Sequence, residues 1–144
     1  MAGARADVIA AGHICLDVIP AFREAKGGVG QILVPGKLVD VGPAITATGG
    51  PVSNVGLALH RLGLSTRLMG KVGDDSFGVA ILEFIRQQGA DLADGMIVAP
   101  GEHSSYTIVI SLPGVDRIFL HCPGANDTFG AEDVPPEKLE GARL

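Results

Sequence analysis

The most constraining feature of this sequence is an alternation of short apolar runs with longer runs that have helical spacing. Residues 7–11, 67–72 and 96–99 are apolar runs of the length of buried strands. Residues 51–62 and 76–88 lie between them, and their apolar side chains recur at helical intervals. A strand–helix–strand–helix–strand order places parallel strands in one sheet. The sequence therefore predicts an α/β fold with a mostly parallel core sheet.

Both predicted helices carry an apolar face and recognisable ends. Pro51 suits a first helical turn, Asp75 or Ser76 suits an N-cap, and Gly63 and Gly89 suit the residue that ends a helix. We expect the apolar residues of each helix to be buried as one stripe. These residues are Val52, Val55, Leu59 and Leu62 in the first helix and Phe77, Ile81, Phe84 and Ile85 in the second.

Two stretches do not fit this rhythm. Residues 18–50 have no helical period and are interrupted by glycine and proline, so we expect two or three short strands there. A later hairpin is predicted in residues 104–121, with a turn at Pro113–Asp116. We expect residues 18–48 and 104–121 to form one small sheet that projects from the core. The predicted pieces are residues 31–34, 37–41 and 44–48 in the first stretch, 105–111 and 117–121 in the hairpin, and a short helix at 136–140 near the end.

Composition excludes several classes of protein. The chain has 144 residues, of which 19% are charged and 47% hydrophobic, which indicates one globular domain rather than a disordered chain or a coiled coil. The net charge is −5 and Lys and Arg are scattered, so no nucleic-acid surface is expected. No run approaches eighteen apolar residues, so no membrane association is expected. The start of the chain is typical of a first strand, not a secretion signal, so we expect a cytoplasmic protein.

The metal-binding residue types are few and scattered. Two cysteines, Cys15 and Cys122, are too few for a zinc site or a disulfide scaffold, and we expect both to be reduced thiols. The four histidines show no metal-like spacing. We therefore expect no metal site in this chain and assign all four histidines to structural or surface positions.

A double glycine directly before the first helix is the strongest candidate binding motif. Gly49 and Gly50 would let the backbone approach a ligand closely, with the free N–H groups of the first turn facing it. Asn54 follows in the first turn, and its amide can donate to and accept from a sugar hydroxyl. The alternative interpretation, an ordinary loop-to-helix junction, remains open from these residues alone.

Two positions elsewhere, one acidic and one amide, have a similar logic. Asp17 follows the first strand, where α/β sheets bind ligands, and its carboxylate could hold two neighbouring hydroxyls; a solvated loop residue is the alternative. Asn126, within Gly124–Asp127, gives a slightly weaker signal of the same kind. Lys26–Gln31 has the glycines of a phosphate-binding loop but lacks its Lys-Ser/Thr ending and its helix, so it is interpreted as a hairpin tip.

Taken together, these motifs resemble the ribokinase-type (PfkB) sugar kinases. Residues 49–63 and 70–78 are similar to the N-terminal signature of that family, and Gly12 with Asp17 matches its opening strand and sugar-binding Asp. Pro123–Asn126 resembles the segment where the family's lid returns to the core. The resemblance implies a ribokinase-like fold whose small sheet is a lid over the sugar and often a homodimer interface. It also implies that Asp17, Gly49, Gly50 and Asn54 hold the sugar, with Asn126 at the lid–core junction.

The sequence departs from the family pattern in three respects. Gly56 stands where the family usually has a small residue such as Ala, and Cys15 stands where ribokinases often place an Asn that touches the sugar. The family's C-terminal half, with its Gly-Ala-Gly-Asp segment, catalytic Asp and ATP pocket, has no counterpart in residues 1–144. We therefore expect the N-terminal half of an ATP- and Mg²⁺-dependent kinase that phosphorylates a primary hydroxyl of a sugar or nucleoside. In that case the chain holds no catalytic residue and is inactive alone; a non-catalytic sugar-binding or dimerisation module is the alternative.

Overall fold

The computed structural model describes residues 6–22 and 28–143. Lys26 and Gly27 of the loop interpreted as a hairpin tip lie outside the described residues. The strands are β1 (Val8–Ala11), β2 (Cys15–Ala21), β3 (Gly42–Gly49), β4 (Thr66–Met69), β5 (Lys71–Gly73), β6 (Ile97–Ala99), β7 (Tyr106–Ile110) and β8 (Ile118–Cys122). The α-helices are α1 (Val29–Ile32), α2 (Gly50–Arg61), α3 (Ser76–Gln88) and α4 (Pro136–Leu139). Three 3₁₀ helices are η1 (Ala90–Ala93), η2 (Gly124–Thr128) and η3 (Ala131–Asp133).

The core strands are parallel, as the rhythm of the sequence predicts. β1 pairs with β4, and β5 pairs with β6, both in parallel register. β4 and β5 follow one another along the chain and are separated by Gly70, whose carbonyl accepts from Ile97 N at 2.9 Å. One nearly continuous strand therefore pairs with β1 along its first half and with β6 along its second half.

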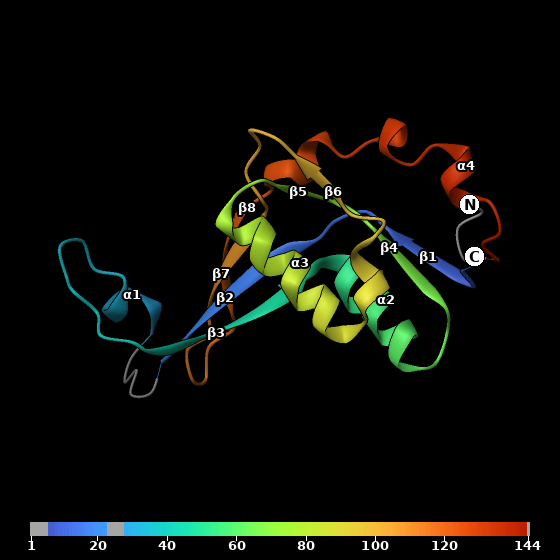
Figure 1. Cartoon of the computed structure of the whole chain (residues 1–144). Coiled ribbons are helices and arrows are strands. Elements are labelled where there is room, and N and C mark those ends of the chain that lie inside the picture. Colours follow the sequence, from blue (N-terminus) through green and yellow to red (C-terminus); the bar gives the residue numbers. More distant parts are fainter. Residues whose placement is uncertain (1–5, 23–27, 144) are drawn as a thin grey trace.

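The helices α2 and α3 lie beside these strands on one side (Figure 1). The core between them is built from aliphatic side chains that are fully buried, among them Ile14, Val52, Leu68, Ile81 and Ile85. The predicted ends of both helices are confirmed. Asp75 is the N-cap of α3, and Gly89 is the C-cap of α3. Gly63, with φ +89°, follows α2 and donates to His60 O at 2.9 Å, which is the left-handed end expected for glycine.

The buried face of α2 differs from the predicted one. Val55 is 52% exposed and Leu62 is 79% exposed, whereas Val52, Ser53, Gly56 and Leu57 are buried. The reason is Gly56, because a Cβ atom placed on it would collide with Leu68 of β4 and lie 3.1 Å from Ala10 Cβ of β1. The missing side chain lets α2 rest directly on the sheet, so the buried face is centred on Gly56.

A second sheet has four strands in the order β3-β2-β7-β8. β2 is antiparallel to β3 and parallel to β7, and β7 and β8 form the antiparallel hairpin. It extends away from the core, and α1 lies at its far end (Figure 1). Residues 44–48 belong to β3 as expected. The sheet begins earlier than predicted, at Cys15, so Asp17 lies within a strand rather than in a loop.

The predicted strands at residues 31–34 and 37–41 are wrong. The chain forms the short helix α1 there and has no strand between α1 and β3. Ile32 explains the difference, because it is buried in a small cluster with Ile110 and Leu112 of the hairpin. Curling the segment back over the end of the sheet buries this side chain, which an extended strand would leave in water.

The last segment of the chain crosses back over the core strands (Figure 1). Lys71 Nζ of β5 holds it, donating to Thr128 O at 2.7 Å and pairing with Asp133 Oδ2 at 2.9 Å. Farther on, Arg143 N donates to Asp7 O at 3.1 Å beside β1. These contacts fix η2, and therefore Asn126, relative to the core sheet.

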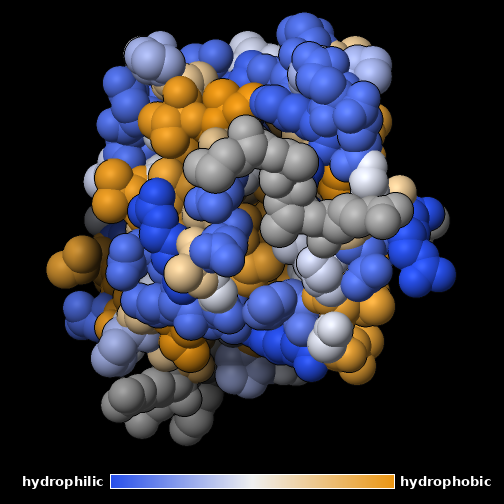
Figure 2. All heavy atoms as spheres, turned by 45° about the vertical axis from the view of Figure 1, so that its right-hand side comes forward, coloured by the Kyte–Doolittle hydropathy of each residue, from blue (hydrophilic) through white to orange (hydrophobic). Residues whose placement is uncertain are grey.

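The surface keeps a substantial apolar part. Figure 2 shows hydrophobic side chains open between polar ones on the face it presents. Among the described residues, exposed large apolar side chains include Ile45, Val55, Leu62, Val79, Phe119 and Leu120. Within residues 6–22 and 28–143, no helix has both the length and the apolar character needed to cross a membrane.

Candidate functional site

The carboxylate of Asp17 packs directly against Gly49. Asp17 lies in β2 and is partly buried, and its pairing partners are Ala47 of β3 and Thr107 of β7. A Cβ atom on Gly49 would collide with Asp17 Oδ2 and lie 3.0 Å from Oδ1. Glycine at position 49 is therefore what allows the carboxylate to lie against the backbone at the start of α2.

Gly50 is constrained by its conformation and by a backbone neighbour. Its φ is +84°, a value that residues with a side chain rarely adopt. A Cβ at this position would lie 2.5 Å from the carbonyl oxygen of His13. The same carbonyl accepts from Val52 N at 3.2 Å in the first turn of α2. No side chain caps this helix, because the N-cap residue is Gly49. The double glycine thus joins the first turn of α2 closely to the loop before β2.

Cys15 supplies a hydrogen bond to Asp17. The thiol is buried, and its Sγ lies 3.4 Å from Asp17 Oδ1. Burial, together with the nearby Asp17 carboxylate, raises the pKa of Cys15 to about 11, so the thiol keeps its proton at neutral pH. Cys15, which stands where the ribokinases that this sequence resembles often have an Asn, is thus a weak donor directed at the carboxylate.

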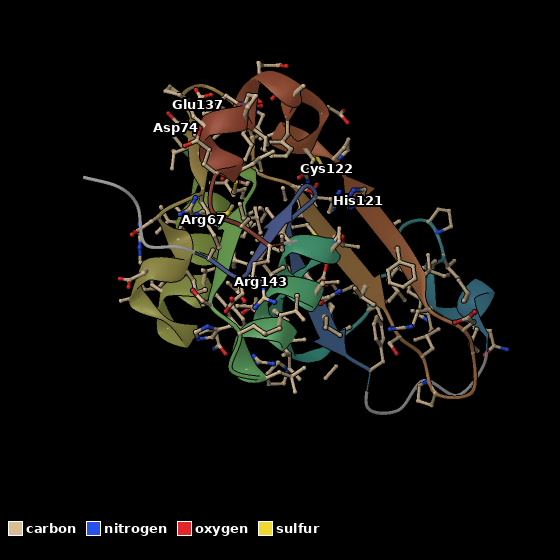
Figure 3. The ribbon with its side chains drawn as sticks, turned by 90° about the vertical axis from the view of Figure 1, so that its right-hand side faces the viewer. Arg67, Asp74, His121, Cys122, Glu137 and Arg143 are labelled. Carbon is tan, nitrogen blue, oxygen red and sulfur yellow. The ribbon has the colours of Figure 1, made fainter. Side chains whose placement is uncertain are left out.

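Two histidines that the sequence analysis assigned to structural or surface roles lie beside this group. The ring of His121 on β8 accepts or donates a hydrogen bond at Nδ1, 3.0 Å from the Thr107 hydroxyl. It also stacks on the ring of His13, with 5.3 Å between centroids. Figure 3 shows His121 at the end of β8 that reaches the core. The strand register determines where His121 lies, because Thr107 pairs with both Asp17 and His121.

Asn126 lies at the junction of the second sheet and the core, and its side chain is already engaged. Its Oδ1 accepts from Ile14 N at 3.1 Å, and its Nδ2 donates to Ile14 O at 2.9 Å and to Pro123 O at 3.1 Å. Both amide hydrogens therefore have partners. These hydrogen bonds hold the backbone at Ile14, between His13 and Cys15, and so help to fix the position of Asp17.

Asn54 is not joined to the other candidates. It is exposed on the first turn of α2, and its side chain has no hydrogen bond within the described part of the chain. It lines a hollow of about 220 Å³ together with Thr48, Ser53 and Phe84. The structure thus brings Asp17, Gly49, Gly50 and Asn126 into one connected group and leaves Asn54 beside it with a free amide.

Asp75 has a structural role. It caps α3 by accepting from Gly78 N at 2.8 Å, and it also accepts from Ser104 N at 2.9 Å. Burial alone would raise the pKa of Asp75, but the hydrogen bonds from Ser104 and Gly78 outweigh it and lower the pKa. This carboxylate ties the start of α3 to the segment between β6 and β7.

Neither a metal cluster nor a phosphate-binding loop is found among the described residues. No group of three or more His, Cys, Asp or Glu side chains among residues 6–22 and 28–143 is arranged to hold a metal ion. The helix that follows Gly28 has only four residues, too short for a phosphate-binding loop.

A larger hollow, of about 850 Å³, lies away from Asp17. It is bounded by β4, by the loop that precedes β6 and by α4, with Arg67, Asp94 and Glu137 on its wall. Figure 3 shows Arg67 and Glu137 in this region. None of the predicted site residues lines it, so size alone does not locate the candidate site.

Comparison with known proteins decides the family. The family described as pfkB family carbohydrate kinase matches residues 6–141, nearly the whole chain. The chain belongs to the pfkB family of carbohydrate kinases. This match confirms the family resemblance that the sequence motifs indicate. The solved structures below confirm the ribokinase-like fold with its parallel α/β core.

One curated relative and two solved structures show what this chain is similar to. Fructokinase-1 of Zea mays is 28% identical over 146 residues, which is all of this chain and 42% of the relative. Ribokinase from Giardia lamblia superposes with a TM-score of 0.73 at 18% identity, covering 96% of this chain and 40% of that one. A Burkholderia thailandensis nucleoside kinase in complex with inosine gives a TM-score of 0.63 at 24% identity, covering 82% and 37%. The chain thus spans about two fifths of the length of these relatives.

Proposed function

We propose that this chain supplies the substrate-binding site and lid of a PfkB-type kinase, which transfers the γ-phosphate of ATP to a primary hydroxyl of a sugar or nucleoside. The observation that carries the proposal is the packing of the Asp17 carboxylate on Gly49 at the start of α2. A carboxylate only accepts hydrogen bonds, so it suits the hydroxyl groups of a sugar. The β3-β2-β7-β8 sheet carries Asp17 and would form the lid.

The other candidate residues divide into contacts and supports. Asn54, with a free and exposed amide, would bind a hydroxyl, whereas Asn126 would hold the lid junction through Ile14. Gly49 and Gly50 would let the substrate approach the first turn of α2. The catalytic base, and the residues that bind ATP and Mg²⁺, would lie in the part of the kinase that residues 1–144 do not cover. We therefore propose that residues 1–144 have no kinase activity alone.

We also propose that the lid pairs with a second copy of the chain. Ile45 on β3 is 66% exposed, and Phe119 and Leu120 on β8 are 54% and 52% exposed. These strands are the two edges of the sheet, and exposed apolar side chains on a sheet are typical of a contact surface. Sedimentation should show a dimer at micromolar concentration; a strict monomer would contradict the pairing but not the lid.

Calorimetry with D-fructose, D-ribose and inosine tests the binding site. Asp17→Ala should weaken binding of whichever probe the wild-type chain prefers by about 10- to 150-fold, since a hydrogen bond to a charged group contributes about 1.5–3 kcal/mol. Asp94→Ala, an exposed substitution at the larger hollow, is the matched control and should bind like the wild type. Equal affinities for Asp17→Ala and the wild type, with both folded by circular dichroism, would refute the assignment.

A further inference from the structure

Three polar side chains form a row across the second sheet. Register pairs Asp17 of β2 with Thr107 of β7, and Thr107 with His121 of β8. Directly paired residues project from the same face of a sheet. The opposite face, which includes Leu16 and Tyr106, packs on the core. The row therefore occupies the face of the sheet that is turned away from the core helices.

Contacts along the row fix the His121 ring. Thr107 is only 6% exposed, and its hydroxyl has two acceptors in reach, His121 Nδ1 at 3.0 Å and Cys15 Sγ at 3.8 Å. The nitrogen is nearer and is the stronger acceptor, which favours the tautomer in which the hydroxyl donates to it. In the neutral ring this places the hydrogen on Nε2.

A second contact connects the same ring to the double glycine. His121 stacks on His13 at 30° between ring planes, and a Cβ on Gly50 would lie 2.7 Å from His13 Cδ2. Burial, with a contribution from His121, lowers the pKa of His13, which favours its neutral form. The contacts thus run from Asp17 through Cys15 and Thr107 to His121, and return through His13 to Gly50, which follows the glycine that the carboxylate packs against.

We propose that His121 is a further substrate-binding residue, positioned by Thr107, whose Nε2–H donates to a hydroxyl oxygen of the sugar bound at Asp17. The inference rests on the proposed function. His121 is exposed, and its Nε2 has no partner within the described residues. Asp17 accepts and His121 donates from strands on either side of β7, so together they suit a substrate with hydroxyl groups at separate positions, as in a polyhydroxylated sugar.

Matched variants separate this role from a structural one. His121→Phe keeps an aromatic ring against His13 but removes the donor, and should weaken binding of the preferred probe among D-fructose, D-ribose and inosine by about 3- to 10-fold. His121→Gln keeps a side-chain N–H and should recover part of the affinity. Thr107→Val should weaken binding, whereas Thr107→Ser should bind like the wild type. His103→Phe, at a side chain that is 88% exposed, is the control.

The outcomes distinguish the two proposals. If the wild-type chain binds none of the three probes, the proposed function fails and this inference fails with it. If Asp17→Ala loses binding but His121→Phe does not, only the role of His121 is overturned. Should His121→Phe not fold, ring ¹⁵N shifts of His121 in the wild-type chain decide. A shift of Nε2 at saturating probe supports the contact, and unchanged ring nitrogens overturn it.

Discussion

Replacing Gly49 with Ala tests the arrangement of Asp17 with little disturbance of the backbone. Gly49 has φ −119° and ψ −177°, an extended conformation that any residue adopts. The new methyl group would collide with Asp17 Oδ2 and lie 3.0 Å from its Cγ. Because both neighbours belong to a partly buried side chain, the carboxylate can turn away, and the substitution acts on the candidate site rather than on the fold.

The magnitude follows from what that movement breaks. Turning the carboxylate separates it from the Cys15 thiol, now at 3.4 Å, and from the position where it would bind a hydroxyl. Losing a hydrogen bond to a charged group costs about 1.5–3 kcal/mol, so affinity should fall by about 10- to 150-fold. The free energy of unfolding should change by less than about 1 kcal/mol, since Ala also restricts the unfolded chain.

Gly50→Ala is the matched contrast. It combines φ +84° with a Cβ only 2.5 Å from the backbone oxygen of His13, which cannot turn away. Left-handed strain of about 1–2 kcal/mol and overpacking of about 1–3 kcal/mol should lower stability measurably in urea. Calorimetry and urea unfolding on both variants check the reasoning. It is refuted if Gly49→Ala binds the preferred sugar as tightly as the wild-type chain.

Four further predictions concern stability and chemistry. Gly56→Ala gains about 1 kcal/mol of helix propensity but overpacks Leu68 by about 1–3 kcal/mol, so the urea midpoint should fall or stay level. The hydrogen bond from Lys71 lowers the pKa of Asp133, and the hydrogen bonds to Asp75, which outweigh its burial, lower the pKa of Asp75. Both carboxylates therefore stabilise the folded chain above their usual pKa of 3.8. This stability is lost as the pH falls through their lower pKa values in the folded chain. Acid titrations of unfolding should therefore be flatter in Asp75→Asn and Asp133→Asn. The buried Cys15 thiol, with its pKa near 11, should resist a thiol reagent at pH 8, so the folded chain should show one reactive cysteine and the unfolded chain two. Mixed with ATP, Mg²⁺ and sugars, residues 1–144 should release no ADP above a blank without protein, and turnover dependent on Asn54 would contradict this.

Local signals in the sequence predicted much of the core. The helix α3 starts at an Asp75 N-cap and ends at Gly89, and both signals come from adjacent residues. At the end of α2, Gly63 and Leu64 donate to His60 O and Leu59 O at 2.9 and 3.2 Å, a motif that glycine alone marks. Such ends depend on a few neighbouring residues, so the sequence is sufficient to locate them.

Tertiary packing decided what the sequence did not predict. Periodicity alone placed Val55 and Leu62 inside, but Gly56 turns α2 so that its glycine face contacts the sheet. Likewise, Ile32 is drawn into a cluster with Ile110, about eighty positions away in sequence, and the predicted strand curls into α1. In both cases the deciding partner is distant in sequence.

In the candidate site, too, local motifs predicted some residues, whereas others are placed only by packing between distant segments. The sequence motifs predict Asp17, Gly49 and Gly50, and the structure packs Asp17 on Gly49 and Gly50 on His13, although their role in binding stays a prediction. His13 and His121 were interpreted as structural or surface residues because no local spacing marks them. Their placement depends on the register of β2, β7 and β8, which no short motif reveals.

The central claim is that a sugar binds at Asp17 and the double glycine. Titrating the ¹⁵N-labelled chain with D-fructose, D-ribose and inosine, and following every backbone amide by NMR, tests this claim most directly. We predict saturable shifts at Asp17, Gly49, Gly50 and His121, and their loss in Asp17→Ala. Shifts confined to the larger hollow beside Arg67, or no shifts with any of the three probes at millimolar concentration, would contradict the account.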